Sequence, residues 1–293
     1  MTVDRVAAPP TSAGPPGLPA GSCDTHSHVF GPFGQFPPLR PSVYALPDAD
    51  PATHGSMRET LGVRYGVLTQ PAPYADDPAA MLHAIERSAG ALKAVAVAGP
   101  DIGDDVLARW HAGGIVGLRF TEMRAPTGDR YPGSEPFESL IALAPQLRTL
   151  GMHAQLWATA NQFAQWLPRL IGLGVPLVLD HMAMPDIAAG VDAPAFRAIC
   201  DALTSGDLWV KLVLARVSRQ APDHADARPF HDALVATRAD RMLWGSDWPY
   251  VRLSPPPDAG EMLATFLRWV PDEATQRAIL VDNPARLYRF AGA

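Results

Sequence analysis

The stretch SCDTHSHVF, residues 22–30, is the most informative segment for the fold. Its pattern predicts a β-strand that carries two histidines. Side chains alternate between the two faces of a strand, so Asp24, His26 and His28 are expected on one face. Two histidines near the end of one strand predict side chains that point into a common site. An ordinary pair of histidines that hydrogen-bond to loops is the alternative at this point.

Seven further short runs of apolar and β-branched residues follow, separated by amphipathic segments, several of which end at glycine. The eight predicted strands are 22–28, 65–69, 92–98, 116–121, 153–157, 177–181, 208–214 and 242–247. Strands that alternate with helices predict parallel βα units. Eight such units in a chain of 293 residues predict an α/β fold of the (β/α)8 TIM-barrel type. No glycine-rich nucleotide motif follows the first strand, which disfavours a Rossmann sheet.

Composition and charge exclude several classes of protein. Lys and Arg number 24 against 30 Asp and Glu, and this net charge of −6 disfavours a nucleic-acid partner. No apolar run approaches the ~18 residues of a membrane-spanning helix. Cys23 and Cys200 form no metal-ligand motif and predict reduced thiols in a cytoplasmic protein.

Residues 1–21, rich in Pro, Gly and Ala, are expected to be a flexible arm before a single catalytic domain, 22–293. The sequence leaves the oligomeric state open.

Two more predicted strands end in residues that carry chemistry. Asp247 has the parity of Leu243 and Gly245 at the tip of 242–247, and His181 ends 177–181. Active sites of TIM barrels lie at the carboxyl ends of the strands, so these side chains are expected beside the two histidines. Asp247 there would serve as a general base or a metal ligand. A turn aspartate and a satisfied polar pair are the alternatives when each is taken alone.

Three arginines also fall at or just after strand ends: Arg119, Arg124 and Arg216. A guanidinium binds a carboxylate through two parallel hydrogen bonds. Several arginines at the open end of one barrel therefore predict a small anionic substrate. A surface salt bridge is the alternative for each, and Arg130 is a substitute candidate for Arg124. Trp157, at the tip of 153–157, is expected to line the same cavity.

The motifs DTHSH (24–28), LDHMAMPD (179–186), WGSDWP (244–249) and LVDNPARLY (280–288) together resemble the amidohydrolase-related family. The resemblance covers about residues 22 to 290. Within the family, the segments 24–37, 119–120 and 179–186 look like those of 2-pyrone-4,6-dicarboxylate lactonases and sugar lactonases. The resemblance implies a distorted barrel and hydrolysis of a small carboxylated lactone. Metal-dependent decarboxylation and lactone isomerisation are the alternatives in the same superfamily.

The resemblance also implies a role for each candidate residue. Asp247 would take a proton from the attacking water, and three histidines would stabilise the oxygen of the lactone carbonyl: His26, His28 and His181. The arginines would hold substrate carboxylates. Two departures bear on the substrate: Trp157 stands where the pyrone lactonases carry tyrosine, and the spacing from Arg119 to the next arginine is one residue shorter.

Catalysis without a metal is the expectation for this sequence. The strand 153–157 carries no histidine at its tip, and Arg119 occupies the position where a bridging lysine or glutamate would stand in metal-dependent relatives. A single zinc ion is the alternative cofactor, with four residues as its candidate ligands: His26, His28, His181 and Asp247.

Overall fold

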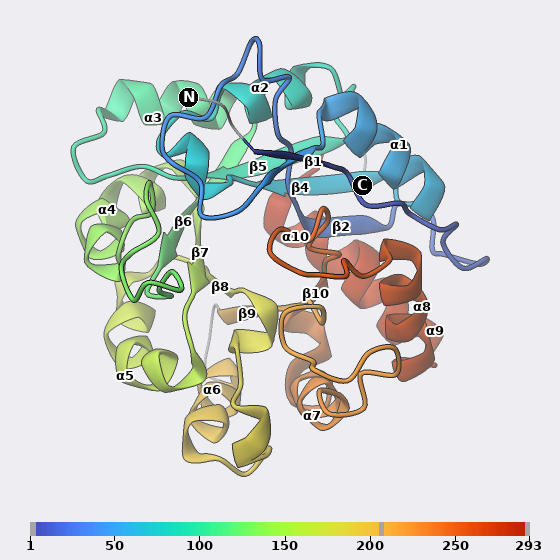
Figure 1. Cartoon of the computed structure of the whole chain (residues 1–293). Helices are drawn as coiled ribbons and strands as arrows, with labels where there is room; N and C mark the ends of the chain where they lie inside the picture. Colours follow the sequence, from blue (N-terminus) through green and yellow to red (C-terminus); the bar gives the residue numbers. More distant parts are fainter. Residues whose placement is uncertain (1–3, 205–207, 291–293) are drawn as a thin grey trace.

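The computed structural model describes residues 4–204 and 208–290, and its centre is a sheet of eight parallel strands. The strands are β2 (Cys23–Ser27), β4 (Tyr65–Thr69), β5 (Leu92–Ala96), β6 (Ile115–Thr121), β7 (His153–Trp157), β8 (Leu177–Leu179), β9 (Leu208–Leu212) and β10 (Met242–Trp244). They follow one another in chain order around the barrel (Figure 1). Each of the eight predicted strands is present, although five are shorter than predicted, and the (β/α)8 fold is confirmed.

The barrel closes between its first and last strands through the segment that follows β10. The hydroxyl of Thr25 donates to the carbonyl of Trp244 at 2.7 Å, and the backbone N–H of Asp247 donates to the carbonyl of His26 at 2.8 Å. The N–H of His28 in turn donates to the carbonyl of Trp248 at 2.9 Å. These bonds fix the segment after β10 against the end of β2, where the candidate residues lie.

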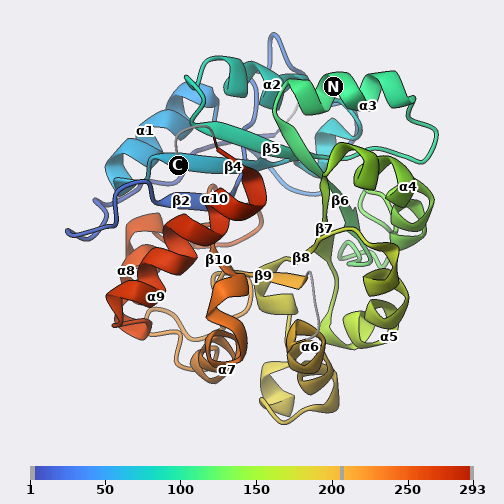
Figure 2. The same ribbon diagram turned by 180° about the vertical axis from the view of Figure 1, so that it is seen from behind.

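Helices surround the strands and cover their outer faces (Figures 1 and 2). They are α1 (Pro51–Leu61), α2 (Ala79–Glu86), α3 (Asp104–Ala112), α4 (Phe137–Leu150), α5 (Ala160–Leu170), α6 (Pro194–Thr204), α7 (Arg228–Arg238), α8 (Ala259–Trp269), α9 (Glu273–Arg277) and α10 (Asn283–Tyr288). Within the described residues, no helix is long and apolar enough to cross a bilayer.

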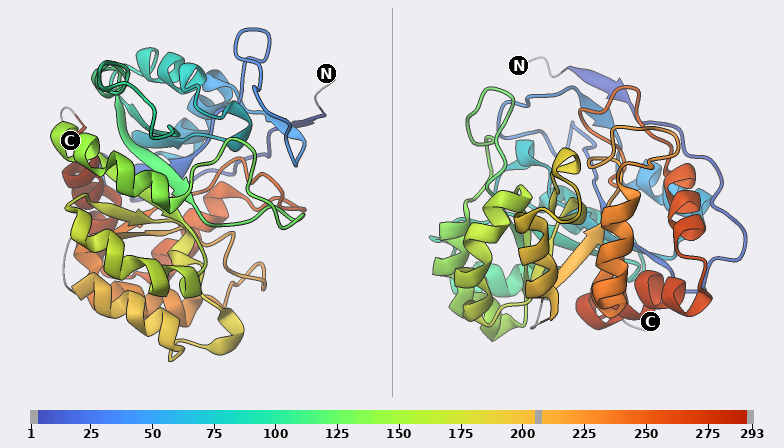
Figure 3. Two further views of the ribbon diagram at one scale, coloured as in Figure 1. Left: turned by 90° about the vertical axis from the view of Figure 1, so that its left-hand side faces the viewer. Right: turned by 90° about the horizontal axis from the view of Figure 1, so that it is seen from below.

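The two ends of the barrel differ in chemistry. Apolar side chains that include Tyr65, Val178 and Leu243 fill the amino-terminal end, where Tyr288 and Phe290 pack against them. The helix α10 lies across this end (Figure 2). Long connecting loops gather on the opposite side of the molecule (left-hand view of Figure 3). Within residues 4–204 and 208–290, the amino-terminal end is thus filled by apolar side chains, and the polar candidate residues lie at the carboxyl end.

The N-terminal arm follows the barrel surface. Its strand β1 (Arg5–Ala7) pairs in parallel with β3 (Leu46–Asp48), and Arg5 forms an ion pair with Asp48. Further along, the N–H of Ser12 donates to Asp258 at 2.8 Å. The arm thus has partners on the barrel, and its predicted flexibility stays a prediction.

Candidate active site

A cavity opens at the carboxyl ends of the strands, and most of the candidate residues lie around it. Six of the residues that line it were predicted from the sequence: His28, Arg119, Trp157, His181, Arg216 and Asp247. His26 lies behind them, fully buried, with its ring 4.8 Å from that of His181. Parts of the chain more than 200 residues apart therefore meet at one place.

Two of these residues reach the cavity by turns rather than by strand parity. The predicted strands 177–181 and 242–247 are too long, because β8 ends at Leu179 and β10 ends at Trp244. His181 and Asp247 both adopt left-handed backbone conformations, with φ of 50° and 68°. A non-glycine residue held in this region is uncommon and is often found at functional sites.

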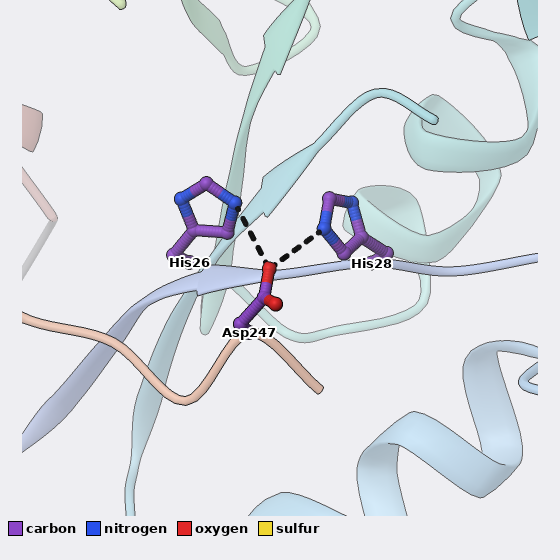
Figure 4. Close-up of side chains that lie close together, drawn as sticks. All are labelled: His26, His28 and Asp247. Carbon is purple, nitrogen blue, oxygen red and sulfur yellow. Dashed lines mark ion pairs between the residues drawn. The ribbon is translucent and has the colours of Figure 1, made fainter. Parts of the chain in front are cut away.

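Asp247 lies between His26, on β2, and His28, just after β2 (Figure 4). Its Oδ1 atom is 3.6 Å from Nε2 of His26 and 3.5 Å from Nε2 of His28. Its Oδ2 atom is 2.7 Å from Nε of Arg216. Burial raises the pKa of the Asp247 carboxyl, but Arg216 and the histidines outweigh burial and hold this pKa well below its ordinary value. Asp247 is therefore ionised at neutral pH.

The tautomer of His28 follows from its second contact. Its Nδ1 atom is 2.7 Å from the backbone carbonyl oxygen of Thr69. A carbonyl only accepts hydrogen bonds, so Nδ1 of His28 carries a proton. In neutral His28, Nε2 is then an acceptor that faces Oδ1 of Asp247. A proton or a cation is needed between these two atoms.

Beneath the cavity, Asp180 joins most of the polar side chains of the barrel interior. Its Oδ2 atom accepts from Nε and Nη2 of Arg119 at 3.0 and 2.9 Å, and from Nε2 of Gln155 at 3.2 Å. Its Oδ1 atom is 3.2 Å from Nδ1 of His26. Burial raises the pKa of Asp180, yet His26 and Arg119 together lower it well below its usual range.

Lys211, on β9, is a buried cation at the centre of this network. Its ammonium donates to the carbonyl of Thr25 at 2.7 Å and to Oε1 of Gln155 at 2.6 Å, and it lies 3.9 Å from Asp180. Burial lowers the pKa of Lys211 to about 8, while Asp180 acts in the opposite direction. The ammonium is thus charged at neutral pH and loses its proton just above it.

Asp24 holds the turn that carries Asp247. Its carboxylate accepts from the N–H and the hydroxyl of Ser246, at 2.9 and 2.6 Å, and from the N–H of His26 at 3.1 Å. Burial raises the pKa of Asp24. Three donors around one carboxylate make Asp24 a positioning residue for both Asp247 and His26.

Two histidines of the site, His26 and His181, are neutral. Burial lowers the pKa of His181 to about 4, and burial lowers that of His26 well below its ordinary value. A neutral imidazole still donates one N–H, which suits an oxygen that gains negative charge.

The predicted arginines separate into two groups. Arg119 and Arg216 lie in the cavity wall, where each contacts a buried carboxylate. Arg124 is exposed and lies outside the residues that line the cavity in the described part of the chain. Its substitute candidate, Arg130, donates to the carbonyl of Thr121 at 3.0 Å instead. Arg252, which was not predicted, lines the cavity.

Trp157 lies in the cavity wall, between two other side chains. The ring of Tyr131 stacks on it, with centroids 5.4 Å apart and planes 27° apart. The guanidinium of Arg119 lies 4.9 Å from the centroid of Trp157. Its contact with substrate stays a prediction.

Sequence reasoning missed the interior network. Lys211 and Gln155 give one usable signal each, because both interrupt apolar strands at positions that face inwards, WVKLV and HAQLW. Asp180 precedes His181 in the sequence, and this position alone does not indicate its contacts with Arg119 and Gln155. Nothing local marks Arg252, since it follows β10 in a proline-rich loop.

The donor set fits one divalent metal ion. Nε2 of His26 has no hydrogen-bond partner among the described residues, and it converges with Nε2 of His28 and Oδ1 of Asp247. Two imidazoles and a carboxylate with the cavity as an open position are a zinc-like set. His181 belongs to a second cluster, with His26 and Asp180.

Comparisons with known proteins agree with this geometry. A family model described as amidohydrolase matches residues 23–290. The chain is 32% identical over 275 residues to a 4-sulfomuconolactone hydrolase of Hydrogenophaga intermedia, covering 92% of this chain and 89% of that protein. It is 31% identical over 282 residues to a 2-pyrone-4,6-dicarboxylate hydrolase of Comamonas testosteroni, covering 92% and 91%.

A solved structure also matches this chain over most of its length. The structure of a probable 2-pyrone-4,6-dicarboxylic acid hydrolase from Acinetobacter baumannii, with citric acid bound, matches with a TM-score of 0.79 and 25% identity. The match covers 92% of this chain and 100% of that chain.

Proposed function

Because this chain belongs to the amidohydrolase family, we propose that it opens the ring of a small carboxylated lactone with water. The observation that supports this most directly is Asp247, an ionised carboxylate that lines the cavity beside neutral histidines. The sequence relatives are named as hydrolases of two lactones of this kind. A carboxylate base with hydrogen-bond donors at the developing oxyanion suffices for ester cleavage.

In the proposed reaction, Asp247 accepts a proton from water while the water oxygen bonds to the carbonyl carbon of the lactone. The carbonyl oxygen becomes negative and accepts a hydrogen bond from His181, whose side chain lines the cavity. The intermediate then expels the ring oxygen, which takes the proton back from Asp247. One water is consumed, and the product is an open chain with a new carboxylate and a new hydroxyl.

Arg216 links substrate binding to the strength of the base. Its Nε lies 2.7 Å from Asp247, and this pairing makes the carboxylate a weak base. The terminal nitrogens of a guanidinium remain free to bind a second carboxylate. A substrate carboxylate that draws the charge of Arg216 towards itself raises the basicity of Asp247 when the substrate is bound.

The charges of the buried site support catalysis without a metal. Three carboxylates, Asp24, Asp180 and Asp247, face three cationic side chains, Lys211, Arg119 and Arg216. With His26 and His181 neutral, the charges of these six side chains balance, and a divalent ion would add two positive charges in a buried place.

If a zinc ion is bound, His26, His28 and Asp247 would hold it. Zinc there would lower the pKa of a bound water and polarise the carbonyl. His26 and His28 would then be metal ligands and not hydrogen-bond donors, and Asp247 would act on a water bound to the metal.

Hydrolysis of a lactone panel tests the proposal. The panel contains 2-pyrone-4,6-dicarboxylate, 4-sulfomuconolactone and a sugar-acid lactone, with acid release followed by a pH indicator and products identified by NMR. A ring-opened hydroxy or keto acid is expected. An isomeric lactone without acid release, or carbon dioxide as product, would replace this proposal by isomerisation or decarboxylation.

The proposed location is the cytoplasm. Cys23 and Cys200 are both free thiols, as is usual for proteins of a reducing compartment.

A further inference from the structure

We infer that Arg252, in the loop after β10, binds a second anionic group of the substrate, a carboxylate or a sulfonate, at the outer end of the cavity. The inference rests on the proposed function, and it narrows the substrate class to lactones with two negative charges. Arg252 lines the cavity together with Arg119 and Arg216.

The three cavity arginines differ in what already binds them. Arg119 gives two hydrogen bonds to Asp180, and Arg216 pairs with Asp247 at 2.7 Å. Among the residues that the structure describes, no carboxylate lies within 4.0 Å of the Arg252 guanidinium. Arg252 is therefore the cavity-lining guanidinium whose charge is left for a ligand.

Arg252 is nevertheless held in place. Its Nη1 atom donates to the hydroxyl of Tyr131, and its guanidinium lies 5.6 Å from the centroid of the Tyr131 ring. Its backbone adopts a left-handed conformation, with φ of 69°, which a side chain of this size rarely does. A positioned cation loses less conformational entropy when it binds an anion than a freely moving one.

Four side chains that line the cavity contact one another in succession, and we call them the wall column: Arg119, Trp157, Tyr131 and Arg252. Arg119 lies over Trp157 at 4.9 Å, Trp157 stacks on Tyr131 at 5.4 Å, and Arg252 lies beside Tyr131. The column places one cation at each end of a flat aromatic face. A planar ring with anionic groups at two positions fits such a face.

The same arrangement explains why Arg124 is not needed in the cavity. Arg124 lies in the exposed loop after β6, where it forms an isolated bridge with Arg130. The chain brings in a cation from the loop after β10 instead. The two loops meet through the contact between Arg252 and Tyr131.

Three lactones, one of which has one more negative charge than the other two, test the inference. 2-Pyrone-4,6-dicarboxylate is compared with 2-pyrone-4-carboxylate and 2-pyrone-6-carboxylate, in wild type and in Arg252→Met. For the dicarboxylate, KM is expected to rise about tenfold or more with little change in kcat, because a charge-assisted contact is lost. For the monocarboxylate that lacks the group bound by Arg252, KM is expected to be the same in wild type and in Arg252→Met.

A binding measurement separates this inference from the proposed function. Pyridine-2,4-dicarboxylate has the same two charges on a ring that water cannot open, and its Kd is measured by calorimetry against the two monocarboxylates. Arg252→Met is expected to weaken the dicarboxylate about tenfold. If wild type binds the dicarboxylate but opens no lactone, the proposed function fails and the inference stands.

Three further variants complete the test. Tyr131→Phe keeps the ring but loses the hydroxyl, and a smaller loss of dicarboxylate affinity is expected. Arg87→Met, an exposed arginine on the outer helix layer, is the matched control and is expected to change nothing. The inference is overturned if Arg124→Met has the effect and Arg252→Met does not. It is also overturned if Arg252→Met acts equally on all ligands, or if wild type does not bind the dicarboxylate.

Discussion

Asp247 is the residue on which the proposed chemistry depends, and Asp247→Asn tests it. The amide has nearly the same shape but cannot accept the proton of water, so kcat is expected to fall by roughly 10²–10⁴. Steady-state kinetics on the substrate found in the panel measure this. Asp223→Asn, an exposed aspartate, is the control. A purified, folded Asp247→Asn variant with activity within threefold of wild type would refute the role of base.

Lys211 is expected to set the alkaline limit of activity. Its pKa of about 8 means that the ammonium loses its proton as pH rises through 8, and Asp180 then loses a neighbouring positive charge. The pKa of His181, about 4, and the depressed pKa of Asp247 place acid losses far below neutrality. We therefore expect kcat/KM to be flat from about pH 5 to 7 and to fall above about pH 8.

The chain contains two lysines, which makes this test simple. Lys211→Met should lower kcat/KM and remove the alkaline fall, and Lys211→Arg should move that fall to higher pH because arginine keeps its proton. Lys93→Met, on β5, is the control. An unchanged alkaline limb in Lys211→Arg would show that another group titrates there.

At the scale of elements, the strand pair β1–β3 positions the loop that brings Tyr44 to the cavity. Tyr44 lines the cavity and lies two residues before β3, whose Leu46 N–H donates to the carbonyl of Asp4 at 2.8 Å. Deletion of residues 1–8 removes this pairing and the contact of Arg5 with Asp48. Because β1 is exposed, the barrel itself should stay folded.

We expect this deletion to raise KM several-fold, with a smaller change in kcat and a small change in Tm. The loop then has more conformations from which the substrate must select one. Kinetics and thermal unfolding of the truncated protein measure both quantities. A KM equal to that of wild type would mean that the loop keeps its place without the arm.

At the scale of the whole molecule, the balance of buried charge predicts a protein that works without zinc. Elemental analysis of untagged protein should give well below one zinc per chain, and activity should survive a chelator. Stoichiometric zinc, with activity lost on its removal and restored on its return, would establish the alternative with His26, His28 and Asp247 as ligands.

The sequence by itself determined the barrel and most of its site. Strand and helix periodicity are local properties, so all eight strands could be predicted, and the positions of His26, His28 and Arg119 followed from strand parity. Their meeting at one end followed from the topology, because parallel strands of a barrel end at the same face.

Only the tertiary structure decided which charges pair and which are left for a ligand. Arg119 lies on β6 and Arg216 lies in the turn after β9, yet both contact buried carboxylates. Lys211 lies in a network with Gln155 that no local pattern describes. Of these two exposed arginines, Arg252 lines the cavity and Arg124 does not. The physical reason is that electrostatic pairing depends on distances between loops far apart in the chain, and loop conformation is set by contacts rather than by periodicity.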